Sequence, residues 1–165
     1  MYYEKILATD TNAIKELSHL AIEIVKEHFD PIIGTEQNDY MIRKFQSVSA
    51  IKMQLEHGSH YYFVIDNAGN KVGFLAYYPT RNELYLSKFY LQKEQRGKGI
   101  AREILQFVIQ RAIEEGFTSI VLNVNKNNSA VLSYERLGFK KIGEERKAIG
   151  NGFFMDDFIY EYRIR

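Results

Sequence analysis

"LQKEQRGKGIAREIL", Leu91–Leu105, decides the fold, because it joins a strand-like run to a helix-like run through a basic, glycine-rich turn. The first N–H groups of a helix have no partner within the helix, and the helix dipole places partial positive charge there. Gly97 and Gly99 leave space beside these N–H groups, and Arg96 and Lys98 add positive charge. The stretch therefore predicts an anion site, and a pyrophosphate fits this chemistry.

A purely structural interpretation of the same turn is also open. The glycines can serve only to shape the turn, while the basic side chains point into water. The stretch lacks the G-x-x-x-x-G-K-[ST] pattern of a P-loop, and Ile100, Ala101 and Arg102 follow where the dinucleotide-binding pattern needs a third glycine. The turn alone does not distinguish an anion site from a purely structural turn, so motifs elsewhere in the chain are needed.

Outward from this turn, the sequence predicts the element order β, α, α, β, β, β, α, β, α, β, β. Apolar residues recur at a helical period in residues 10–29 and 100–115, which predicts a helix in each range. An "NAGN" turn favours a tight hairpin between two of the strands. Strands are expected at 2–9, 60–66, 71–79, 83–92, 119–124, 139–146 and 153–164, and helices at 10–29, 40–58 (one or two segments), 100–115 and 127–138, with a break at 30–39.

The composition is that of an ordinary globular chain. With 165 residues, 45% of them hydrophobic, we expect one domain, residues 1–165, with a substantial core. The 22 Lys and Arg against 21 Asp and Glu give a net charge of +1, so we expect no nucleic-acid and no membrane partner. The chain has no Cys, which excludes disulfides and fits a cytoplasmic location. Residues 1–10 lack the pattern of a secretory signal, so we expect no export.

Two short motifs resemble the signatures of the GNAT N-acetyltransferase superfamily. "RGKGIA" resembles its acyl-CoA signature, R/Q-x-x-G-x-G/A, and "NNSAVLSYERLGF" is similar to its N-x-x-A signature followed by a tyrosine and a Gly-Phe pair. The motifs occur in the family's order, and the predicted element order resembles the family over nearly the whole chain. The matching residues are Arg96, Gly99 and Ala101 in the first motif and Asn127, Ala130, Tyr134, Gly138 and Phe139 in the second.

The resemblance implies an α/β (α+β) fold with acetyl-CoA as cosubstrate and no metal ion. The central sheet would be mixed and mostly antiparallel, with about six to seven strands, splayed between strands 4 and 5 and flanked by about four helices. Asn127 could equally be only a helix N-cap. The residues implied to bind acetyl-CoA are Phe89, Tyr90, Leu91, Arg96, Gly97, Lys98, Gly99, Ile100, Ala101, Asn127 and Ala130.

Amine attack on a thioester needs a neutral amine and a proton for the leaving sulfur. The resemblance implies that Tyr134 protonates the thiolate, although its place on an amphipathic stripe also suits a core residue. Several family members use a strand glutamate as base at the position where this chain has Tyr85. Glu83 lies two residues earlier on the same strand face and is the substitute candidate. A water relay, or a merely solvated charge at Glu83, is the alternative.

Asp156 and Asp157 are adjacent in a predicted strand, where aspartate is disfavoured. Neighbouring residues point to opposite faces, so one carboxylate must sit among Phe154, Phe158 and Tyr160. The "MDDF" stretch resembles the closing strand of bacterial polyamine-acetylating GNAT proteins, which implies a site for a polycationic amine. The alternative is a frayed strand edge that discourages aggregation.

An acidic bias in residues 25–40 also favours a cationic substrate. Glu36 is the binding candidate, and Glu27, Asp30 and Asp39 add to the bias. Solvated loop charges explain this bias equally well.

The leading interpretation is an acetyl-CoA-dependent N-acetyltransferase that acts on a primary amine of a small molecule by direct attack in a ternary complex. Polyamines and diamines are the favoured acceptors. The alternatives are a protein N-terminal or lysine acetyltransferase and a non-catalytic acyl-CoA-binding sensor. The 4 histidines match no zinc-ligand pattern, so no metal is expected, and the aromatic strand 153–162 could serve a homodimer.

Overall fold

The computed structural model describes residues 1–164, and the chain divides into two compact units. The first unit comprises Met1–Tyr78 and Lys88–Ile104, and the second comprises Pro79–Ser87 and the residues from Leu105 onward. The described residues form seven strands, in the order β1-β2-β3-β4-β5-β7-β6, and five α helices. The predicted α/β fold with a mixed sheet is confirmed, and the single domain over residues 1–165 stays a prediction.

The elements follow the predicted order, and the stretch 40–58, expected to form one or two helical segments, is divided between two helices. Their bounds are β1 Tyr2–Ile6, α1 Thr11–Ile33, α2 Thr35–Phe45, α3 Val48–Glu56, β2 His60–Ile65, β3 Lys71–Thr80, β4 Glu83–Leu91, a 3₁₀ turn Lys93–Gln95, α4 Ile100–Glu114, β5 Ser119–Asn125, α5 Ala130–Arg136, β6 Lys140–Gly150 and β7 Phe153–Arg163.

The break predicted at residues 30–39 is wrong. Helix α1 continues through Pro31 and ends at Gly34, whose φ of +86° is readily adopted only by glycine, and α2 begins directly after it. Pro31 has no N–H to donate to the Glu27 carbonyl oxygen, so one helical bond is missing in the last turn, and α1 ends two residues later. Residues 25–40 are therefore mostly helical, and their charges lie on helix faces instead of in a loop.

The core of the first unit lies between α1 and the antiparallel strands β1, β2 and β3. The apolar stripe of α1 packs there because its residues recur at helical spacing and all face one side. The buried cluster consists of Ile6, Ile14, Leu17, Leu20, Ala21, Ile24, Ile51, Tyr61, Phe63, Phe74 and Ala76. This core supports the strands that lead into the glycine-rich turn.

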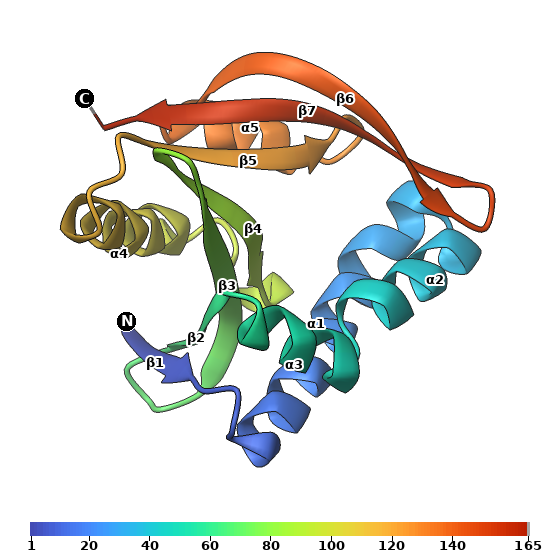
Figure 1. Cartoon of the computed structure of the whole chain (residues 1–165), viewed down its shortest axis with the longest axis horizontal. Coiled ribbons are helices and arrows are strands. Elements are labelled where there is room, and N and C mark those ends of the chain that lie inside the picture. The colour runs from blue at the N-terminus through green and yellow to red at the C-terminus, as the bar shows by residue number, and fades with distance from the viewer. Residues whose placement is uncertain (165) are drawn as a thin grey trace. The chain divides into compact units, whose positions relative to one another are not determined.

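The second unit is built on β5, β7 and β6, with β7 antiparallel to both neighbours. β6 and β7 run side by side as a long hairpin (Figure 1). β6 continues to Gly150, four residues beyond the predicted end, and Asn151 and Gly152 turn the chain with positive φ angles. The start of β4 pairs in parallel with the start of β5, over Glu83–Tyr85 and Ser119–Val121. This is the parallel pair in an otherwise antiparallel arrangement of the described strands.

Candidate functional site

The glycine-rich turn of the first unit has the geometry of an anion site. Gly97 and Gly99 both have a φ of +77°, and Lys98 between them does not, so the backbone alternates in handedness. Such alternation aims successive N–H groups toward one side. Within residues 1–164, the N–H groups of these three residues donate no hydrogen bond. The turn opens directly into α4, a helix of 15 residues, which adds its first unpaired N–H groups at Ile100 and Ala101.

Arg96, which precedes the glycines, is held by two other segments of the first unit. Its Nε and Nη2 atoms donate to the Leu91 carbonyl oxygen at 3.2 and 3.1 Å, and Nη2 lies 3.0 Å from Glu27 Oε2. Lys98 is exposed. The sequence predicts the same role for these two basic residues, but in the structure Arg96 is held by contacts within the protein whereas Lys98 is exposed to solvent.

The last residues of β4 are fixed by close packing. The Tyr90 ring contacts Phe29 and Phe74, with centroids 6.0 and 5.4 Å apart, and Leu91 is buried. A Cβ atom at Gly73 of β3 would lie 2.4 Å from the Tyr90 carbonyl oxygen, so only glycine lets the strands approach this closely. The segment with Phe89, Tyr90 and Leu91, whose N–H groups are predicted to bind the thioester, is thus a rigid part of the first unit.

Lys88, which the sequence analysis missed, is buried in the middle of β4. Its Nζ donates to the Phe45 carbonyl oxygen at 2.5 Å and to Gln46 Oε1 at 3.0 Å, where α2 ends. It also lies 5.1 Å from the centre of the Tyr61 ring. Burial lowers the pKa of Lys88 to about 7. The available signal was its position on the same strand face as the buried Leu84 and Leu86.

In the second unit, Tyr85 is linked to two carboxylates through one asparagine. The Tyr85 hydroxyl donates to Asn123 Oδ1 at 2.8 Å, which fixes the orientation of the Asn123 amide. The Asn123 Nδ2 atom then donates to Glu145 Oε1 at 3.2 Å and to Asp157 Oδ2 at 3.3 Å. Glu83, on the same face of β4 as Tyr85, is half-buried at the strand start. Asn123 and Glu145 escaped the sequence analysis because their contacts span three strands.

The two adjacent aspartates of β7 differ sharply in environment. Asp157 is 3% exposed and lies directly opposite Glu145 in the strand register. Burial, and then the negative charge of Glu145, raise the pKa of Asp157. Asp156 is exposed and lies 3.1 Å from Lys126 Nζ. Because Asp157 is buried, the frayed-edge alternative is wrong for this residue. The aspartate that shares a strand face with Phe158 is Asp156, and it is exposed.

The short helix α5 carries the second signature. Tyr134 is half-buried, and its ring packs edge-on against Phe139 with centroids 5.6 Å apart. The N-cap of α5 is Ser129, whose side chain makes no capping bond, and the neighbouring Asn128 Oδ1 accepts from the Ala130 N–H at 2.9 Å. The Asn127 N–H donates to Asn125 Oδ1 at 2.9 Å. The capping role considered for Asn127 is therefore wrong, and its contact with CoA stays a prediction.

The acidic bias of residues 25–40 does not form an open acidic surface. Asp30 and Asp39 both lie within ion-pair distance of Lys26, at 3.4 and 2.8 Å, and Glu27 pairs with Arg96. Glu36 lies exposed in the first turn of α2. Most of the negative charge that favoured a cationic substrate is thus matched by positive charge within the same unit.

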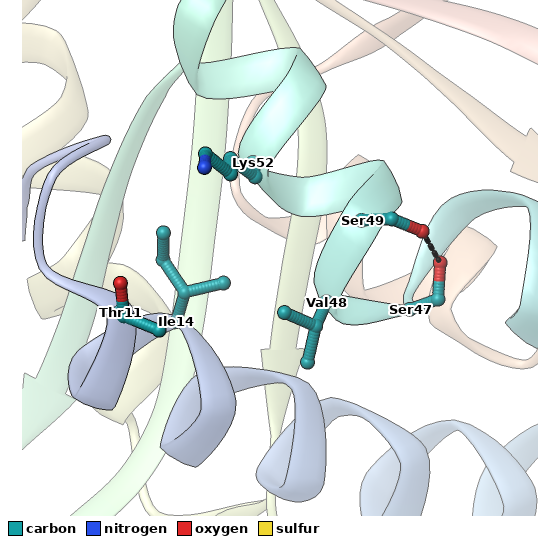
Figure 2. A pocket seen from close by; sticks show the side chains of 6 residues that line it. All are labelled: Thr11, Ile14, Ser47, Val48, Ser49 and Lys52. Atoms are coloured by element: carbon teal, nitrogen blue, oxygen red, sulfur yellow. Dashed lines mark hydrogen bonds between the residues drawn. The ribbon is translucent and has the colours of Figure 1, made fainter.

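A surface pocket of about 550 Å³ lies between the starts of α1 and α3 (Figure 2). Figure 2 shows Ile14 and Val48 facing the pocket and a hydrogen bond between Ser47 and Ser49 at its rim. None of the residues predicted to bind acetyl-CoA lines it, so the pocket carries no argument for the reaction.

Residues 1–164 contain no group of three or more His, Asp or Glu side chains that could hold a metal ion. No helix in this range is long and apolar enough to span a membrane.

The comparisons with known proteins agree with this geometry. The family model described as "Acetyltransferase (GNAT) domain" matches residues 29–155, more than half of the chain. The chain therefore belongs to the GNAT acetyltransferase family, whose members take the acetyl group from acetyl-CoA.

Among curated proteins, N-acetyltransferase family 8 member 2 of Rattus norvegicus is 34% identical over 94 residues, which cover 53% of this chain and 41% of that protein. The chain thus matches less than half the length of this relative.

Solved structures share the fold. The PaiA N-acetyltransferase of Thermoplasma acidophilum, in complex with coenzyme A, has a TM-score of 0.78 and 21% identity, and the match covers 99% of both chains. A ribosomal-protein-alanine N-acetyltransferase of Brucella melitensis has a TM-score of 0.64 and 17% identity, and the match covers 99% of this chain and 100% of that one. At these identities the likeness extends to the fold alone.

Proposed function

We propose that the protein transfers an acetyl group from acetyl-CoA to a primary amine of a small molecule. The observation that carries this proposal is the turn Gly97–Lys98–Gly99, whose open N–H groups lead into the N-terminus of α4. Unpaired N–H groups at a helix start favour a doubly charged diphosphate. A Cβ atom at either glycine would meet nothing within 4 Å, so a ligand can approach the backbone. The residues present fit the pyrophosphate of CoA.

When bound, acetyl-CoA supplies an activated acetyl thioester. A primary amine with a pKa of about 10.4 has to lose a proton before it can react, at a cost of about 4 to 5 kcal/mol at neutral pH. Glu83 accepts this proton, either directly or through a relay of water molecules beside Tyr85. Tyr134 donates a proton to the departing sulfur. Phe89, Tyr90 and Leu91 orient the thioester carbonyl through their backbone.

Polyamines and diamines are the proposed acceptors. The buried Asp157 and its neighbour Glu145 share the single amide of Asn123, and within residues 1–164 neither carboxylate has an ion-pair partner. A protonated amine of an extended polycation would supply the missing positive charge.

A protein N-terminus or a lysine side chain is the second candidate acceptor. The name printed for the Brucella melitensis neighbour, a ribosomal-protein-alanine N-acetyltransferase of the same fold, suggests this class of acceptor. A cytoplasmic location and a homodimer stay predictions.

The experiment is a screen of CoA release with a thiol-reactive dye. The chain has no Cys, so the protein gives no background signal. The acceptors are spermidine, spermine, putrescine, an aminoglycoside, an N-terminal alanine peptide and a lysine peptide. Polyamine turnover supports the proposal, and turnover with peptides alone supports the second candidate. Binding of acetyl-CoA without turnover of any amine would make the protein a sensor and contradict the proposed reaction.

Tyr134→Phe provides the residue-level test. Loss of the hydroxyl should lower kcat by about 10²-fold or more while KM for acetyl-CoA changes little. Tyr2→Phe, which alters an exposed tyrosine of β1, is the matched control and should leave both constants unchanged. An unchanged kcat in Tyr134→Phe would assign this side chain to the core.

A further inference from the structure

Three segments of the first unit meet at the guanidinium of Arg96. They are the end of β4 at Leu91, the C-terminal third of α1 at Glu27, and the residue that precedes the glycine-rich turn. Arg96 Nη1 and Nη2 donate to the two oxygens of Glu27 at 3.4 and 3.0 Å. Nε and Nη2 donate to the Leu91 carbonyl oxygen. The guanidinium therefore ties the backbone on one side of the turn to the adjacent helix.

These contacts leave the guanidinium little capacity for another anion. An arginine has five N–H groups, and the four contacts with Leu91 and Glu27 use four of them. Bidentate binding of a phosphate needs two parallel N–H groups. The charge of Arg96 is also already matched by the Glu27 carboxylate. Arg96 is thus poorly suited to direct phosphate binding, although it belongs to the signature.

The contacts are well suited to hold the turn. The Gln92 N–H donates to the Val72 carbonyl oxygen at 2.9 Å, and the Arg96 N–H donates to the Lys93 carbonyl oxygen at 3.2 Å. These bonds fix the backbone up to Arg96. The next three residues, 97–99, donate no backbone bond within the described chain. The direction of their open N–H groups is therefore set largely by the position of Arg96.

We propose that Glu27 and Arg96 are a pair of positioning residues for the pyrophosphate turn. Glu27 holds the guanidinium, the guanidinium holds the Leu91 carbonyl and the start of the turn, and the N–H groups of Gly97 to Ala101 bind the anion. The inference rests on the proposed function, because it assigns these N–H groups to CoA. It adds Glu27, a residue outside both signatures, to the residues on which cosubstrate binding depends.

The direction in which Glu27→Gln changes the affinity for CoA distinguishes a positioning role of Arg96 from direct phosphate binding. Glu27 is a negative charge next to the segment proposed to bind a diphosphate. If Arg96 bound the phosphates directly, Glu27→Gln would leave CoA affinity unchanged or strengthen it, because repulsion falls and the guanidinium is released. If the pair positions the turn, Glu27→Gln weakens CoA binding despite the loss of negative charge.

The experiment is calorimetric titration of CoA into wild type, Glu27→Gln, Arg96→Gln and the double variant. We expect each single substitution to raise the Kd by about three- to tenfold, and the double variant to bind no more weakly than the weaker single variant. In turnover assays, KM for acetyl-CoA should rise by a similar factor while kcat at saturation changes less. Additive losses in the double variant would overturn the inference, as would a Glu27→Gln variant that binds CoA as tightly as wild type or more tightly.

Glu16→Gln is the matched control, because Glu16 is another α1 carboxylate with a basic partner, Lys71. It should leave CoA affinity unchanged, and equal melting temperatures of all variants would exclude general unfolding as the cause.

Hydrogen–deuterium exchange without any CoA provides a readout that does not depend on the proposed function. Peptides that cover residues 92–99 should exchange faster in Glu27→Gln than in wild type, and equal exchange would overturn the inference. A wild-type protein that fails to bind CoA would instead contradict the proposed function, so the two failures are distinguishable.

Discussion

Replacement of Lys88 with methionine should remove a pH dependence of stability that the buried ammonium creates. The side chain is 7% exposed and donates to the Phe45 carbonyl oxygen and to Gln46 Oε1, both of which are uncharged. Within residues 1–164, no carboxylate lies at ion-pair distance from Lys88. Burial therefore lowers its pKa from the ordinary 10.5 to about 7. Methionine has a similar length and no charge.

The magnitude follows from the two pKa values. Below the folded pKa, Lys88 is protonated in both the folded and the unfolded chain, and the full cost of burying the charge is present. As the pH rises from the folded pKa to the unfolded one, only the unfolded chain keeps the proton, so the free energy of unfolding rises. The rise is at most about 1.4 kcal/mol per pH unit, and it amounts to about 2 to 3 kcal/mol between about pH 6 and pH 9.

The assay is urea unfolding of wild type and Lys88→Met at several pH values in this range. The contributions of other titrating groups cancel in the difference between the two proteins. We expect wild type to gain about 2 to 3 kcal/mol relative to the variant as the pH rises. Lys52→Met, which alters an exposed lysine of α3, should run parallel to wild type. Parallel curves for Lys88→Met would refute the reasoning, because the buried amine would then have an ordinary pKa.

Three further substitutions, two of them with a matched control variant, test other parts of the structure. Gly73→Ala should lower the free energy of unfolding by roughly 1 to 3 kcal/mol, because the added Cβ would lie 2.4 Å from a β4 carbonyl oxygen. Gly143→Ala, whose Cβ would have an ordinary 3.8 Å contact, should cost less in the same urea assay. Gly99→Ala and Gly116→Ala should each cost about 1 to 2 kcal/mol, because both glycines have positive φ, but only Gly99→Ala should weaken CoA binding in calorimetry. Asp157→Asn should raise the free energy of unfolding most at neutral pH, where wild type has to bury the charged carboxylate. This advantage over wild type should shrink as the pH falls through the raised pKa of Asp157, because the cost of burying the charge disappears when the carboxylate is protonated. Equal pH profiles of the two proteins would contradict that reasoning.

Local patterns were sufficient to predict most of the fold. The helical period of α4, the hairpin signal between β2 and β3 and the glycines at both ends of α4 act over a few residues, so their effects are visible in the sequence. The break predicted at 30–39 was wrong, because α1 continues through Pro31 to its last turn and only Gly34 separates it from α2. The sequence offers no measure of how many turns remain after such a proline.

The candidate site was predictable only in part. The signature located the turn that we propose to bind the pyrophosphate, because glycine placement is a local property. The partners of its side chains were not predictable: Arg96 pairs with Glu27 from α1, and Lys88 binds the end of α2. Likewise, the burial of Asp157 and the exposure of Asp156 depend on which face of β7 meets its neighbours. Contacts of this kind form between distant segments and leave no periodic trace in the sequence.

The most direct test of the central claim is mass spectrometry of the acceptor after reaction with acetyl-CoA. Spermidine and a lysine peptide are each incubated with the protein and acetyl-CoA. The mass of each product is measured, and free CoA is quantified with the dye in parallel. The proposed function predicts spermidine that carries one added acetyl group, in an amount equal to the CoA released, and an unmodified peptide. CoA release without any acetylated amine, or acetyl groups on the peptide alone, would contradict it.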